Sequence, residues 1–206
     1  LELANRLLIT ACLAGIPYAL RSLLRCLDRD ARFAMFALPL TYNAHLILGF
    51  VNFLMAIALA LWGLSLAVQQ HTKPKPARAI ALALVALACF YAHVVPFALL
   101  ALGVGLIALG RDRRAMTLRV LPLAPAAIAS AVWMLASPAG RATVHAASGA
   151  EEGPEPSFVP VAFAYADIPN WLTDILHGDV DRNLLRWFAL LFALTALNSG
   201  MDGGTT

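Results

Sequence analysis

The fold is decided by the stretch ARAIALALVALACFYAHVVPFALLALGVGLIALG, residues 77–110, an apolar run interrupted near its middle by Tyr91-Ala92-His93. A helix rises about 1.5 Å per residue, so this run would be roughly 50 Å long as one straight helix. The hydrocarbon core of a bilayer is only about 30 Å thick. The length favours two segments that meet at a polar corner, and the alternative is one long kinked helix.

A second run repeats this pattern. Residues 33–68 are almost entirely apolar and are interrupted by Tyr42-Asn43-Ala44-His45. Each tyrosine–histidine cluster lies close to a proline, Pro39 in this run and Pro96 in the later one. Proline removes a backbone donor and disturbs a helix interior. We therefore expect both runs to fold back at their polar clusters.

The composition indicates that lipid is the solvent of this chain. Hydrophobic residues make up 61% of the 206 residues and charged residues 13%, and the mean hydropathy is +0.75. Soluble domains carry about 25% charged residues. The sequence predicts an all-α fold, a polytopic α-helical integral membrane protein with about six to seven membrane segments, some short or re-entrant.

The basic residues predict the orientation. Eleven of the 15 lysines and arginines fall in three short connections, 21–32, 69–78 and 111–119. The positive-inside rule places such connections in the cytoplasm, here of a multi-pass protein of the cell inner membrane. Connections on the same side require an even number of crossings between them. Each long run must then leave and return, which agrees with the length argument.

The predicted domain is a single helical membrane domain, residues 1–198. Residues 138–183 form an extracytoplasmic loop, with a helix near 168–177 that lies along the membrane surface. Residues 199–206 break the last apolar run abruptly, which suggests a disordered or non-native tail and a fragment of a longer protein. The predicted membrane segments are 6–24, 33–42, 46–68, 77–91, 94–110, 120–137 and 184–197.

The polar corners hold the candidate functional residues. Polar side chains in membrane segments often mark sites, whereas Tyr and His are also common at membrane interfaces, where they act as anchors. Three interpretations stay open for these residues: interfacial anchoring, recognition of a phosphate or a polyol, and metal ligation by the two histidines, for which no third ligand is evident. Asn52 either bonds a neighbouring helix or lines a cavity. The candidates for an outer-face cavity are Tyr42, Asn43, His45, Asn52, Tyr91 and His93.

Other chemistry is not indicated. The sequence contains no nucleotide loop, catalytic triad order, paired-carboxylate motif or zinc spacing. The basic residues lie in loops between apolar runs, which does not indicate nucleic-acid binding. Cys12, Cys26 and Cys89 are interpreted as small core residues. The catalytic residues stay unknown and no metal site is predicted. No cofactor is evident, and a divalent cation is compatible with the chain but not indicated.

The stretch LPLTYNAHLILGFVNFL, residues 38–54, resembles a region of bacterial polytopic membrane proteins related to GT-C-type glycosyltransferases. In those proteins a Gly-Phe-x-Asn-Phe segment similarly opens a long helix, and an aromatic–x–His corner follows, as Phe90-Tyr91-Ala92-His93 does here. The resemblance covers roughly residues 32–114. It implies transfer of a sugar from a polyprenyl-phosphate-linked donor at the extracytoplasmic face. The catalytic aspartate of that family, in the first outer loop, has no counterpart here.

The leading hypothesis is therefore part of a glycosyltransferase-like integral membrane protein, whose partners are the lipid bilayer and a polyprenyl-phosphate-linked sugar. One rival is a transporter or permease, because broken helices with polar corners also build transport sites. The second rival is a structural membrane subunit without catalytic activity.

Overall fold

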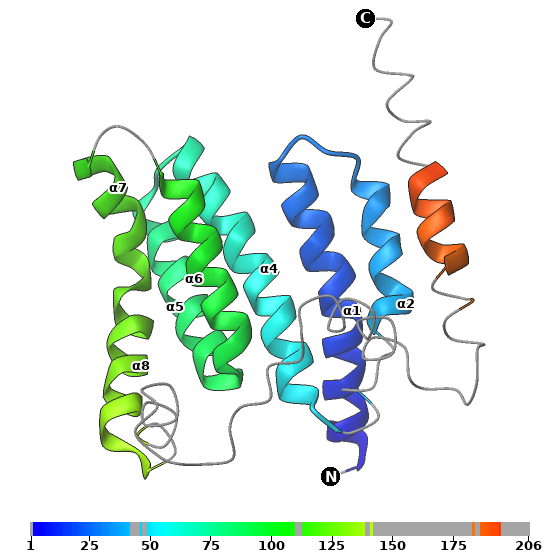
Figure 1. Ribbon diagram of the computed structural model, residues 1–206, viewed down its shortest axis with the longest axis horizontal. Coiled ribbons are helices and arrows are strands. Elements are labelled where there is room, and N and C mark those ends of the chain that lie inside the picture. The colour runs from blue at the N-terminus through cyan, green and yellow to red at the C-terminus, as the bar shows by residue number, and fades with distance from the viewer. Residues whose placement is uncertain are drawn as a thin grey trace, which may run out of the picture.

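The computed structural model describes residues 2–41, 46, 49–109, 113–138, 141, 183 and 186–194. Within these ranges the regular elements are helices and no strand occurs (Figure 1), which confirms the predicted all-α class. Three helices of this part are long and apolar enough to cross a membrane: Glu2–Cys26, Val51–Thr72 and Met116–Ala136. Two shorter apolar helices, Pro76–Ala92 and Val94–Ala108, accompany them. The count of six to seven segments stays a prediction.

The first apolar run forms a hairpin beside the first helix. Helix α1 spans Glu2–Cys26, and a 3₁₀ helix η1, Ala31–Phe36, leads into α2, Ala37–Thr41. Figure 1 shows η1 and α2 descending alongside α1 after a tight turn. These two elements together are about 20 Å long, too short to cross a hydrocarbon core of about 30 Å. The described part of the predicted segment 33–42 is helical, and its membrane depth stays a prediction.

Helix α4, Val51–Thr72, returns along the bundle and runs parallel to α1. A Cβ added to Gly15 of α1 would lie 3.4 Å from the Cβ of Ala58. Further along both helices, the hydroxyls of Ser22 and Ser65 are 2.9 Å apart. Residues 33–68 are thus two antiparallel segments and not one kinked helix, as their length predicts.

The second run is also a hairpin. Helix α5 spans Pro76–Ala92 and α6 spans Val94–Ala108, with His93 alone between them. The Cys89 thiol of α5 donates to the carbonyl of Ala56 across 3.4 Å, and Arg78 donates to the carbonyl of Gln69 across 3.4 Å. Residue numbers rise in α4 as they fall in α5, so these two helices are antiparallel.

Helices α4 and α6 are parallel and pack closely through a glycine. A Cβ added to Gly63 of α4 would lie 2.7 Å from the Cδ1 of Leu100 in α6. Leu64 similarly covers Gly103. Small residues that let backbones approach are typical of helix contacts in lipid. Gly63 and Gly103 have this role between α4 and α6, whereas a Cβ at Gly105 would meet open space.

The basic segment 111–119 differs from the expectation. It was predicted as a loop, but Arg113–Val120 forms helix α7, which continues through the 3₁₀ turn η2, Leu121–Leu123, into α8, Ala124–Ala136. Arginine, methionine and leucine are strong helix formers, so this segment can form a helix without a periodic apolar pattern. The helical stretch that includes α8 therefore begins before Val120, the predicted start.

Helix α4 lies between the two parts of the bundle (Figure 1). One apolar cluster joins α4 to α5, α6 and the start of α8, and includes Leu82, Leu100 and Ala126, each with no exposed surface. The other joins α4 to α1 and α2 through Leu54, Ile16 and Ala37. Cys12 and Cys89 are free and buried, which confirms their role as small core residues.

The helical segment 186–194 packs against η1. Phe36 makes edge contacts with Phe188 and Phe192, with ring centroids 5.0 and 5.1 Å apart, and Phe33 contacts Phe192 at 5.5 Å. This segment falls inside the predicted last membrane segment, 184–197. The predicted surface helix near 168–177 and the tail 199–206 lie outside the described residues.

Candidate functional site

The corner between α5 and α6 is made by His93. Its backbone is extended, with φ −167° and ψ 133°, and its amide donates to the carbonyl of Cys89 across 2.9 Å. The Nδ1 atom of its ring accepts a hydrogen bond from the amide of Val95 at 3.2 Å. Histidine here acts as an N-cap, which satisfies one of the unpaired donors at the start of a helix. The proton of the neutral ring is then on Nε2.

Asn52 joins the first turn of α4 to this corner. Its side-chain amide donates to the carbonyl of Ala92 across 3.2 Å. The neighbouring ring of Phe53 meets His93 edge-on, with centroids 5.0 Å apart and an interplanar angle of 85°. The carbonyl of Ala92 is among the last of α5, which have no partner within the helix. Of the two interpretations of Asn52, the bond to a neighbouring helix is confirmed.

These contacts place the first turn of α4 at the same end of the bundle as the His93 corner. Asn52 lies seven residues after His45, and it contacts the residue before His93. Tyr42, Asn43 and His45 themselves lie outside the described residues, so the structure does not show their side chains. Arg78, the basic residue of α5, by contrast lies at the opposite end of that helix, where it donates to the carbonyl of Lys73 across 2.6 Å.

Tyr91 is an exposed candidate at the same corner. Its side chain is 75% exposed and its ring lies 5.4 Å from that of Phe90. The side-chain amide nitrogen of Asn52 and the Nδ1 of His93 are hydrogen-bonded to the backbone, whereas the Tyr91 hydroxyl and the His93 Nε2 make no hydrogen bond to the described residues. Both groups can donate hydrogen bonds to phosphate or hydroxyl oxygens.

The carboxylates in the described part of the chain are Glu2, Asp28 and Asp30. Glu2 pairs with Arg6, and Asp30 pairs with Arg32. Among the described residues, no group of three His, Cys, Asp or Glu is placed to hold a metal ion.

Two polar features were missed by the sequence reasoning. The first, which we call the Ser65 cluster, joins Ser22 and Cys26 of α1 to Ser65 and Gln69 of α4. Ser65 is 1% exposed, and its hydroxyl lies 2.9 Å from that of Ser22 and 3.2 Å from the Cys26 sulfur. Spacing along one chain could not reveal it, because the partners are about 40 residues apart.

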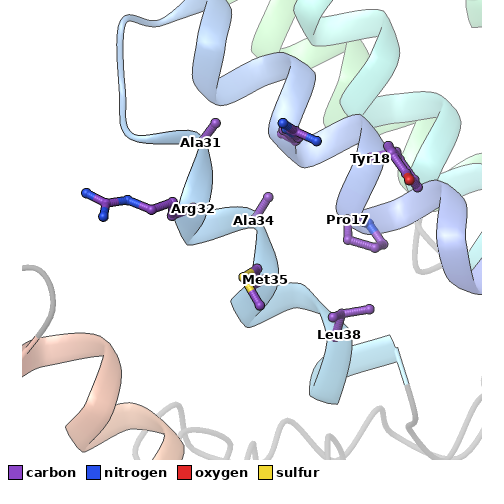
Figure 2. A pocket seen from close by; sticks show the side chains of 8 residues that line it. Pro17, Tyr18, Ala31, Arg32, Ala34, Met35 and Leu38 are labelled. Atoms are coloured by element: carbon purple, nitrogen blue, oxygen red, sulfur yellow. The ribbon is translucent and has the colours of Figure 1, made fainter.

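The second feature is an open groove of about 430 Å³ between α1 and the η1–α2 segment (Figure 2). Figure 2 shows Pro17 and Tyr18 on α1 facing the segment that carries Ala34, Met35 and Leu38. Asp30 fixes the turn between α1 and η1. It caps η1 by accepting a hydrogen bond from the Arg32 amide at 2.8 Å. The arginines of 21–32 were interpreted only as topology signals. The full lining is Pro17, Tyr18, Arg21, Ala31, Arg32, Ala34, Met35 and Leu38.

No protein-family model, curated protein or solved structure matches the chain.

Proposed function

We propose that this chain is the helical core of a membrane protein that binds a polyprenyl-phosphate-linked sugar at the corner end of the bundle, as the likeness to GT-C-type glycosyltransferases implies. The observation that carries the proposal is the hydrogen bond from Asn52 to Ala92, which brings the start of α4 to the α5–α6 corner. A phosphate with an attached sugar offers many acceptors to donors gathered at one end of a bundle. The exposed apolar helix faces beside it suit the polyprenyl chain.

Each candidate residue has a proposed role. The Tyr91 hydroxyl and the Nε2–H of His93 donate to the phosphate or the sugar. Asn52 positions the corner through the α5 carbonyl and does not itself touch the substrate. Tyr42, Asn43 and His45 complete the site from the first corner. The chemical step needs a carboxylate that the described part of the corner lacks, so it is assigned to residues elsewhere in the full protein.

The proposal requires the corners to face outward. In a variant with all three native cysteines replaced by alanine, Tyr91→Cys should react with a membrane-impermeant maleimide added outside spheroplasts. Lys75→Cys, at the opposite end of α5, should react only after the membrane is opened. Both positions are exposed in the structure. Labelling of Lys75→Cys from outside and of Tyr91→Cys only from inside would reverse the orientation and remove the outer site.

Binding is tested on the full-length protein with a polyprenyl phosphate, by native mass spectrometry from detergent. Tyr91→Phe and His93→Asn should each weaken binding about fivefold to tenfold, because one hydrogen bond to a charged group contributes about 1.5 kcal/mol or less when exposed. Asparagine is itself a good N-cap, so His93→Asn keeps the helix start while it removes the ring. Trp133→Phe, on α8, is the control. Unchanged binding in both corner variants would contradict the proposal and favour a structural role.

A further inference from the structure

The groove between α1 and the η1–α2 segment has a charged end and an apolar end. Because η1 and α2 run antiparallel to α1 (Figure 1), Arg21 and Ala31 lie toward the turn, whereas Pro17, Met35 and Leu38 lie deeper along the bundle. Met35 is 67% and Leu38 46% exposed, so the deep end of the groove is apolar and open to the surroundings of the bundle. A pocket of about 430 Å³ is of ordinary size for a small ligand or for part of a lipid.

The charged end carries a net positive charge. Residues 21–32 contain four arginines and two aspartates, a net charge of +2. Arg32 is held by Asp30, with its Nε 2.8 Å and its Nη2 2.7 Å from the same carboxylate oxygen, and Figure 2 shows its side chain pointing away from α1. The Arg21 guanidinium makes no hydrogen bond or ion pair to the described residues. Arg21 is therefore the groove's available cation.

The position of Arg21 matters as much as its charge. It lies five residues before the end of α1, a helix long and apolar enough to cross a membrane. An arginine at this depth extends its side chain toward the headgroup level. Basic pockets between membrane helices on the cytoplasmic side are the sites that bind anionic lipid headgroups.

We propose that an anionic phospholipid of the surrounding bilayer occupies this groove, with its phosphate on Arg21 and one acyl chain along Tyr18, Met35 and Leu38. A water-soluble anion would use the charged end and leave the apolar end uncovered, whereas a phospholipid matches both. The charged end of the groove lies at the end of the bundle opposite the His93 corner. It is independent of the proposed sugar-lipid function, and either one can fail alone.

The test is native mass spectrometry of the full protein released from detergent, titrated with phosphatidylglycerol or with phosphatidylcholine of the same acyl chains. One tight phosphatidylglycerol adduct is expected, and Arg21→Gln should weaken it about fivefold, the effect of one arginine near an anionic lipid. Arg25→Gln is the matched control, because Arg25 is exposed on the same helix one turn later and does not line the groove. The control should bind as the wild type does.

Three results would overturn the proposal. Equal weakening by Arg21→Gln and Arg25→Gln would indicate diffuse attraction to the basic turn. Equal binding of phosphatidylcholine would show that the phosphate charge is not selected. Displacement of phosphatidylglycerol by a polyprenyl phosphate in an Arg21-dependent way would make the groove a substrate site. Thermal unfolding of each variant in detergent verifies that it is folded.

The acyl-chain half of the groove has its own variant. Met35→Ser should weaken phosphatidylglycerol binding by severalfold, since it removes apolar surface that a lipid tail would cover. Ile80→Ser changes an exposed apolar residue of α5, 61% exposed and away from the groove, and should leave binding unchanged. Equal effects of these two substitutions would contradict the placement of the tail. Tyr91→Phe, which tests the corner, should not alter phosphatidylglycerol binding.

Discussion

Asn52 donates a hydrogen bond to the backbone carbonyl of Ala92 across 3.2 Å, which ties the first turn of α4 to the last turn of α5. The two residues are 40 positions apart in the sequence. Asn52 follows the first tyrosine–histidine interruption, and Ala92 belongs to the second. This single contact brings the start of α4 to the corner between α5 and α6. Its energetic weight can be measured.

Replacing Asn52 with alanine should destabilise the protein by about 0.5–1.5 kcal/mol, the range of a single interhelical hydrogen bond in a membrane protein. The carbonyl of Ala92 would lose its partner. Thermal or denaturant unfolding in detergent measures the change. Thr72→Ala is the control, because the Thr72 hydroxyl donates only within its own helix, to the Gln69 carbonyl at 3.2 Å. Equal losses for both variants would mean that the interhelical bond has no special role.

The contact of Gly63 with Leu100 predicts an asymmetry among glycines. Gly63→Ala should destabilise the fold by about 1 kcal/mol, because the new Cβ would displace Leu100, which has no exposed surface, and such overpacking outweighs the gain in helix propensity. Gly105→Ala meets open space and should stabilise α6 by up to about 1 kcal/mol. Chemical unfolding of both variants measures the difference. Stabilisation by Gly63→Ala would contradict the close approach of α4 and α6.

The Ser65 cluster allows the pairing of α1 with α4 to be tested covalently. In Ser65→Cys, the new thiol should form a disulfide with Cys26 under mild oxidation, since the Cys26 sulfur lies 3.2 Å from the Ser65 hydroxyl. Peptide mapping of the oxidised protein by mass spectrometry identifies the linkage. Wild-type protein, whose three cysteines are free, should give no such product. A disulfide between position 65 and Cys89 would instead contradict the pairing of α1 with α4.

The Asp30–Arg32 pair predicts a pH dependence at the α1–η1 turn. The Arg32 side chain, and then its backbone amide, lower the pKa of the Asp30 carboxyl below its ordinary value of 3.8 by hydrogen bonds to the charged form. The contacts therefore stabilise the folded state above the ordinary pKa, and this contribution is lost as the pH falls through the lowered pKa.

An NMR titration of the Asp30 carboxyl carbon checks this directly. Its midpoint should lie below 3.8 in the wild type and should rise toward that value in Arg32→Gln. Lys75→Gln, which removes a basic residue from another connection, serves as the control and should leave the midpoint unchanged. A midpoint that is the same in wild type and Arg32→Gln would contradict the pairing.

Much of the fold was predictable because it depends on length and local composition. The hairpin of residues 77–110 was predicted as 77–91 and 94–110, and its helices are Pro76–Ala92 and Val94–Ala108. A run too long for the bilayer, with one polar interruption, leaves few other solutions. The start of α8 was placed too late, because the basic stretch before it is helical without being apolar.

The candidate site was predictable only in part. The interruption at His93 predicted where the chain reverses, but not that the ring nitrogen would cap the helix it opens. Asn52 was among the candidates, yet its partner is a backbone carbonyl, which no side-chain pattern reveals. The groove arises from the packing of η1 against α1. In the sequence both segments are simply apolar with basic ends, so this tertiary contact could not be predicted.

The chain reverses at His93 with a single residue between α5 and α6. This short connection sets the rotation of α6 about its own axis relative to α5. One residue turns a helix by about 100°, so one amino acid inserted after His93 would rotate the whole of α6 by that angle relative to α5. Gly103 would then lose its contact with Leu64, and Leu100 would lose its contact with Gly63. The shortness of the connection therefore fixes which face of α6 reaches α4, and a change of length at this corner should disrupt that packing.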